Sequence, residues 1–170
     1  MTELAKKIDQ AINIMHEKEG KYLTFILDNE DYGIGILKVK EIIGVMPITS
    51  IPRTPEFLRG VINLRGKVIP VVDLRLKFGM EAIDYTERTC IIVVETESQV
   101  GTVMIGIVVD SVSEVLNIKV EDIDETPTFG SKLDTGYILG MAKMEGGVKI
   151  LLDIDKILTG DNIAVLEKVA

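Results

Sequence analysis

The chain has 170 residues, of which 46% are hydrophobic and 27% are charged, a composition typical of a globular protein with a real core. Its formal net charge of −8 argues against binding to nucleic acid or anionic membranes, since both need a surplus of lysine and arginine. No apolar run reaches the ~20 residues that span a bilayer, and the N-terminus does not resemble a signal peptide. We therefore expect a cytoplasmic protein that does not insert into the membrane.

Residues 1–20 predict an N-terminal helical extension. Leu4, Ile8, Ile12 and Met15 recur at helical spacing, with charged residues between them. Thr2 is suited to cap the first turn of this helix.

The segment after this helix predicts mainly short strands. Strands are expected over residues 22–27, 32–36, 48–51, 61–64 and 67–74. The last two form a hairpin at Arg65-Gly66, where glycine tolerates the positive φ of a tight turn. Helical turns are expected at 39–43 and at 54–60, the latter because Thr54-Pro55 is a favourable helix start.

The second half repeats this order of elements. Strands are expected over residues 89–94, 100–109, 137–144 and 148–154, with a polar turn at 95–99. Residues 111–116 are expected to form a short helix or turn, 121–125 an acidic loop, and 161–170 a C-terminal helix.

The two halves align residue by residue, which indicates an internal duplication. Residues 57–74 match 137–154 with a constant shift of 80, and residues 39–43 match 112–116 with a shift of 73. We therefore expect a mainly β fold with two lobes, about 21–80 with return elements and about 86–160. About five short strands in each lobe avoid open edges best by closing into a small barrel.

The sequence contains no recognisable catalytic or metal-binding set. His16 and Cys90 are the only residues of their kinds, too few for a zinc site or a Ser-His-Asp triad. Asp73 and Asp153 follow apolar strands at repeated positions, and capping of the next turn explains them better than acid–base chemistry. We expect no cofactor, no metal and no enzymatic activity.

Four segments resemble the CheW-like domain family, and together the match covers about residues 21–160. They are residues 30–43, 57–79, 106–116 and 136–158, and the run NLRGKVIPVVDL within the second is highly specific. The resemblance implies two five-stranded SH3-like barrels with a hydrophobic seam between them. It also implies a chemotaxis adaptor that binds the cytoplasmic helical hairpin tip of chemoreceptors and the regulatory domain of the histidine kinase CheA.

The resemblance also nominates contact residues. A receptor contact in a groove between the lobes is implied for Ile36, Val39, Glu41, Arg65, Val112 and Val115. A kinase contact at the barrel ends is implied for Ile48, Thr49, Ile51, Asp124 and Phe129. An apolar groove suits a receptor helix, and Arg65 at a turn tip suits charge-assisted hydrogen bonds.

Alternatives to these assignments remain open from the residues alone. Ile36 and Val39 can equally be core residues, Arg65 a solvated turn residue, and Phe129 a side chain buried under its loop. The chain can also be a small-molecule-binding β protein that uses the inter-lobe groove, or a hydrolase that uses Asp73 or Asp153.

Overall fold

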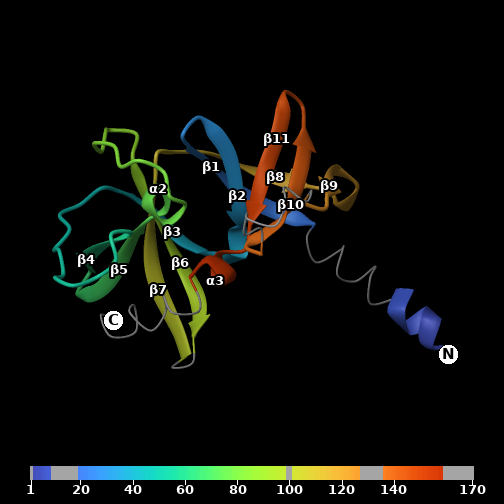
Figure 1. The fold of residues 1–170 in the computed structure, drawn as a ribbon, viewed down its shortest axis with the longest axis horizontal. Coiled ribbons are helices and arrows are strands. Elements are labelled where there is room, and N and C mark those ends of the chain that lie inside the picture. The colour runs from blue at the N-terminus through green and yellow to red at the C-terminus, as the bar shows by residue number, and fades with distance from the viewer. Residues whose placement is uncertain (1, 9–18, 99–100, 127–135, 159–170) are drawn as a thin grey trace.

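The computed structural model describes residues 2–8, 19–98, 101–126 and 136–158, which form two β-sheets and several short helices (Figure 1). A six-stranded sheet has the order β8 (Ser111–Ile118), β1 (Gly20–Leu27), β2 (Glu30–Gly35), β11 (Gly147–Leu152), β10 (Ile138–Met144) and β9 (Ile123–Asp124). A five-stranded sheet has the order β3 (Val39–Gly44), β6 (Cys90–Ser98), β7 (Gly101–Val109), β5 (Lys67–Asp73) and β4 (Leu58–Leu64). The expected mainly β, two-lobed fold is confirmed.

The short helices lie between consecutive strands or directly after the last strand. The single turns η1 (Ile36–Lys38) and η2 (Val120–Asp122) precede β3 and β9. The helices α2 (Leu74–Lys77) and α3 (Ile154–Ile157) follow β5 and β11. Asp73 and Asp153 cap these two helices through their side chains, as expected from their repeated positions.

Each sheet takes strands from both halves of the chain. The six-stranded sheet joins β1 and β2 of the first half to β8 through β11 of the second, and the five-stranded sheet joins β6 and β7 to β3, β4 and β5. The two sheets therefore do not follow the expected lobe boundaries of about 21–80 and about 86–160. The reason is an exchange of strands between the two repeats, since the chain crosses from one sheet to the other after β2 and again after β7.

The backbone confirms the duplication in detail. The β4–β5 hairpin has a register shift between Leu58 and Gly60, and the β10–β11 hairpin has one between Ile138 and Gly140, 80 residues later. Parallel pairing then places Val71 beside Gly106 in one sheet and Leu151 beside Gly33 in the other. Equivalent strands thus make equivalent pairings in the two sheets.

Buried apolar residues form three clusters, and the largest lies between the sheets. This cluster, the seam core, includes Phe25 and Ile34 from the six-stranded sheet and Ile92 and Ile107 from the five-stranded sheet, each 0% exposed. Two smaller clusters, one on each sheet, use the opposite faces of the same strands. Both faces of the central strands are therefore buried, which explains their unbroken runs of Ile and Val.

Several sequence-based expectations for local structure were wrong. Residues 39–43 and 111–116 lie in strands β3 and β8 and are not helical. Their apolar residues at spacings of three and four resembled a short helix because each strand contains a bulge opposite its partner. The expected turn at 95–99 is also too early, since β6 continues to Ser98.

The expected helix at 54–60 is absent, and β4 begins at Leu58. Gly60 has a φ of +141°, and an ideal Cβ there would lie 2.0 Å from the carbonyl oxygen of Thr49. Glycine at this position lets residues 48–51 approach β4, where Thr49 forms an isolated bridge with Val61. The expected strand at 48–51 is reduced to this bridge.

The N-terminal helix is present over residues 3–8, and Thr2 caps it as expected. The Thr2 hydroxyl accepts a hydrogen bond from the Ala5 amide at 3.2 Å. Residues 9–18 of the expected helical extension and the expected C-terminal helix lie outside the described residues, and Gly20 already belongs to β1.

Candidate functional site

Arg65 and Glu41 form an ion pair on the surface of the five-stranded sheet. Arg65 lies at the tip of the β4–β5 hairpin with a φ of +50°, and the Asn63 side chain accepts a hydrogen bond from the Gly66 amide at 2.8 Å. Glu41 projects from β3, an edge strand that pairs only with β6. A tight turn thus carries the guanidinium of the β4–β5 hairpin to β3, the strand at the opposite end of the sheet order.

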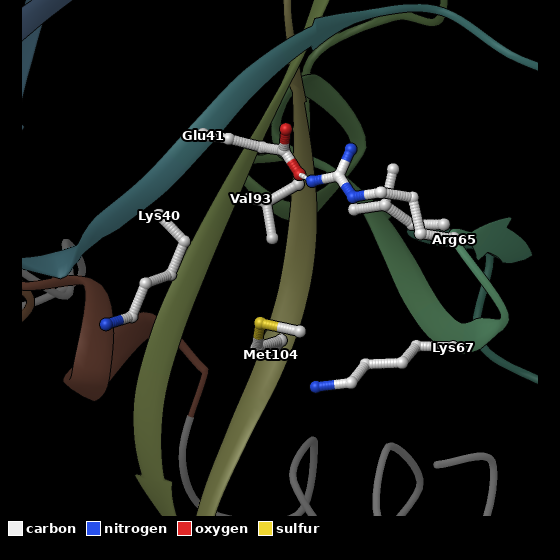
Figure 2. Close-up of a pocket in the computed structure, with 7 residues that line it drawn as sticks. Lys40, Glu41, Arg65, Lys67, Val93 and Met104 are labelled. Carbon is white, nitrogen blue, oxygen red and sulfur yellow. Dashed lines mark hydrogen bonds and ion pairs between the residues drawn. The ribbon is translucent and has the colours of Figure 1, made fainter.

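This ion pair borders a depression of about 300 Å³, which we call the tip pocket (Figure 2). It is lined by Lys40, Glu41, Leu64, Arg65, Lys67, Val93 and Met104. Val93 and Met104 form its apolar floor, and the two lysines lie on opposite sides of it (Figure 2). Its lining carries three cationic groups and one carboxylate, and a second carboxylate, that of Glu95 on β6, pairs with Lys40.

The other expected receptor residues do not line the tip pocket. Ile36, Val39 and Val112 are partly buried and pack against the seam core. Val39 and Val112 occupy equivalent places in the two sheets, opposite Val94 on β6 and Phe25 on β1. Val115, on β8, is 48% exposed. The structure therefore brings together Glu41 and Arg65 and places Ile36, Val39 and Val112 along the seam, while Val115 is exposed on β8.

A second, more apolar hollow of about 630 Å³ opens at one end of the seam, and we call it the seam groove. Its walls include Tyr22, Ile36, Leu37, Lys38, Leu139, Ile154 and Asp155. Leu37 in η1 also lines this hollow and is 93% exposed, so its apolar side chain faces water. Sequence reasoning did not select Leu37, because nothing in its spacing separates it from the core residues beside it.

The expected kinase residues divide between the two lobes. Ile48 packs against the cluster on the five-stranded sheet and lines a hollow of about 300 Å³ with Arg59, Ile83 and Tyr85. Thr49 is exposed and Ile51 half-buried in the same segment. On the other lobe, Asp124 in β9 is exposed and pairs with Lys143 at 3.2 Å. Phe129 lies outside the described residues.

Asp73 is buried in a polar cluster beside the hollow that Ile48 lines. Its carboxylate accepts hydrogen bonds from the amides of Arg75 and Leu76 and from the Tyr85 hydroxyl at 3.0 Å. Arg59 Nε lies 3.6 Å from the same carboxylate. Burial, followed by the Asp73 charge, raises the pKa of Tyr85 to about 12. These contacts give Asp73 a structural role as cap and anchor.

The described residues lack two features that other classes of function would need. Among these residues, no group of three or more His, Cys, Asp or Glu side chains gathers where a metal ion could bind. No helix within the same ranges is long and apolar enough to cross a membrane.

Comparison with known proteins identifies the family. The model of the CheW-like domain matches residues 21–162. The chemotaxis protein CheW of Klebsiella aerogenes is 43% identical over 150 residues, which cover 88% of each chain, and that of Thermotoga maritima is 36% identical over 155 residues, which cover 89% of this chain and 95% of that one. The crystal structure of the scaffolding protein TtCheW from Thermoanaerobacter tengcongensis aligns with a TM-score of 0.73 at 36% identity, covering 85% of this chain and 95% of that chain.

These matches do not support the alternative of a small-molecule-binding β protein. They agree with the strand order and the duplicated hairpins, since a solved relative shares the arrangement over most of both chains. On these grounds the chain belongs to the CheW-like domain family of chemotaxis proteins.

Proposed function

We propose that this chain is a non-catalytic coupling protein of bacterial chemotaxis, which joins chemoreceptors to the regulatory domain of the histidine kinase CheA. Its place would be the cytoplasm, at receptor arrays on the inner face of the membrane. The family membership supports a role in chemotaxis, and the surface features of the two lobes support two separate contacts.

The observation that carries the receptor contact is the Arg65–Glu41 pair beside an apolar floor. A receptor tip is a helical hairpin, and a helix binds by placing an apolar stripe in a groove while its polar flank meets charged groups at the rim. Val93 and Met104 offer the apolar floor, and the exposed Arg65, with five N–H donors, offers the rim. Ile36, Val39, Val112 and Val115 would extend the contact along the seam.

The kinase contact is proposed at the ends of the two lobes. Ile48, Thr49 and Ile51 lie beside the hollow that contains Arg59 and Tyr85, residue types that often dominate the binding energy of interfaces. Asp124, and Phe129 beyond the described residues, would provide a second contact on the other lobe.

Calorimetric titration with a receptor hairpin fragment and, separately, with the CheA regulatory domain tests both contacts. We expect Arg65→Asp to weaken receptor binding by at least tenfold, about 1.4 kcal/mol, because it turns an attractive charge into a repulsive one beside Glu41. Affinity for the CheA domain and the free energy of unfolding should change little, since Arg65 is exposed.

Lys119→Asp is the matched control, because Lys119 is an exposed cation on the other lobe, just after β8. Equal receptor affinity for the wild type and Arg65→Asp would remove Arg65 from the contact. Failure of the wild type to bind either fragment would refute the proposed function as a whole.

A further inference from the structure

Each of the two crossovers between the sheets is tied by an ion pair to the short helix that ends a repeat. After β7, the crossover residue Asp110 pairs with Arg75 of α2. After β2, the crossover residue Lys38 pairs with Asp155 of α3. Arg75 and Asp155 are 80 positions apart and therefore equivalent in the duplication, yet they carry opposite charges.

The Arg75–Asp110 pair is buried and held from several directions. The side chains are 10% and 20% exposed, and Arg75 Nη1 lies 2.6 Å from Asp110 Oδ2. The same oxygen accepts a hydrogen bond from the Asp28 amide at 2.8 Å, and Arg75 Nε donates to the Glu81 carbonyl at 2.9 Å. The Asp28 carboxylate also lies 3.7 Å from Arg75 Nη2, and breaking a largely buried ion pair is costly, so several contacts hold this crossover in place.

The Lys38–Asp155 pair is more exposed and has less support. Lys38 Nζ lies 2.6 Å from Asp155 Oδ2, and the side chains are 39% and 30% exposed. The other carboxylate oxygen of Asp155 is buried and accepts no hydrogen bond from the described residues. Exposed ion pairs are weak and are screened by salt, so this second pair can open without unfolding the chain.

Both members of the weaker pair line the seam groove, beside Ile36 and the exposed Leu37. We propose that the Lys38–Asp155 pair is a releasable latch, which holds η1 against α3 and sets the width of the seam groove. The Arg75–Asp110 pair keeps the lobes joined at the other crossover while the latch opens. This inference deepens the proposed function and rests on it for its partner: release of η1 would admit a receptor helix beside Ile36.

The latch can be tested without any partner, by measuring the distance between η1 and the six-stranded sheet. Spin labels are placed at Leu37→Cys and at Val148→Cys, both exposed, in a Cys90→Ala background, and pulsed dipolar spectroscopy gives the distance distribution. We expect Asp155→Asn to broaden the distribution at low salt. Added salt should broaden it in the parent protein and have little further effect in Asp155→Asn.

Lys40→Gln is the matched control. It removes the Lys40–Glu95 pair, which is similarly exposed but joins β3 to β6 within the five-stranded sheet. An unchanged distribution in Asp155→Asn, or equal broadening in Lys40→Gln, would overturn the latch.

A second measurement connects the latch to binding. In unlabelled protein, Asp155→Asn should raise the association rate of a receptor hairpin fragment several-fold, because η1 no longer has to be released first. An unchanged rate, together with a broadened distribution, would show that the latch opens but does not control receptor entry. Absence of receptor binding in every variant would count against the proposed function, while the distance measurement would still decide the latch.

Discussion

The Thr24 hydroxyl donates a hydrogen bond to the Glu114 carbonyl at 2.8 Å and accepts one from the Glu114 amide at 3.1 Å. The two residues are 90 positions apart in the chain. They meet where the β1–β8 register shifts between Leu23 and Phe25, so the side chain takes the place of a missing backbone partner. This contact joins β8, from the second repeat, to β1, from the first repeat, within the six-stranded sheet.

Thr24→Val should lower the free energy of unfolding by about 1–3 kcal/mol, because Thr24 is 0% exposed and the change removes both of its hydrogen bonds to the Glu114 backbone. Urea unfolding measures this cost. Thr102→Val, an exposed position on β7, is the control and should stay within about 0.5 kcal/mol of the wild type. Equal stability of the two variants would show that water replaces the hydroxyl.

Gly60→Ala should destabilise the protein by about 2–4 kcal/mol. A Cβ at this position would lie 2.0 Å from the Thr49 carbonyl oxygen, at a φ of +141° that side chains rarely adopt. Gly44→Ala is the control, since no heavy atom lies within 4 Å of its ideal Cβ, and it should cost less than about 1 kcal/mol. Chemical denaturation of both variants checks the difference, and similar costs would contradict the close approach.

The equivalent residues Asp73 and Asp153 should differ in their contribution to stability. Asp73 is 2% exposed and accepts from two amides and the Tyr85 hydroxyl, whereas Asp153 accepts from the Lys156 amide at 3.3 Å. We expect Asp73→Ala to cost about 3 kcal/mol or more and Asp153→Ala about 1 kcal/mol. Urea unfolding of the two variants side by side gives both losses in the free energy of unfolding. A larger loss for Asp153→Ala than for Asp73→Ala would refute this account.

Tyr85 should make stability fall between pH 10 and about 12. Its pKa is raised from 10.0 to about 12 in the folded protein, so above pH 10 the unfolded chain loses the phenolic proton while the folded chain keeps it. The stabilising contribution is complete below pH 10 and disappears as the pH rises to about 12; because Tyr85 is only half-buried and solvent screens its contacts, we expect roughly 1–2 kcal/mol.

Urea unfolding across this pH range, compared between the wild type and Tyr85→Phe, isolates the effect. Tyr22 and Tyr32 also have pKa values raised by burial, so a part of the slope should remain in the variant. An identical slope in both proteins would mean that Tyr85 ionises normally.

The duplicated hairpins were predictable because turn chemistry and alternation are local. Arg65-Gly66 marks a two-residue turn between apolar runs, and both hairpins form as expected, although the second turn lies at Glu145-Gly146 and not over Gly146-Gly147 as predicted. The caps at Thr2, Asp73 and Asp153 were predictable for the same reason, since each side chain binds backbone within three residues.

The exchange of strands could not be predicted from the repeat. Alignment shows that β3 and β8 are copies, but either copy would satisfy either sheet, because Val39 and Val112 face equivalent partners. Only packing at the seam decides between them. The bulge in each strand also places its apolar residues at helical spacing, so both segments were wrongly predicted as helical turns.

The contacts within the candidate site could not be predicted either, because they join residues that are far apart in the sequence. Glu41 and Arg65 meet as a pair, although a spacing of 24 residues gives no sign of it. The sequence did not identify Arg75 as a buried ion-pair residue. Charged residues are rarely buried, and its two carboxylate partners come from turns that are distant in the sequence.

The exchange of strands between the two repeats also determines the smallest fragment of this chain that can fold. A cut in the loop after α2 would leave each fragment with strands of two incomplete sheets, so neither fragment should be stable alone and the two should fold only on mixing. By the same reasoning, a protein made of one repeat could complete its sheets only by taking β3-like strands from a second copy, as a swapped dimer does.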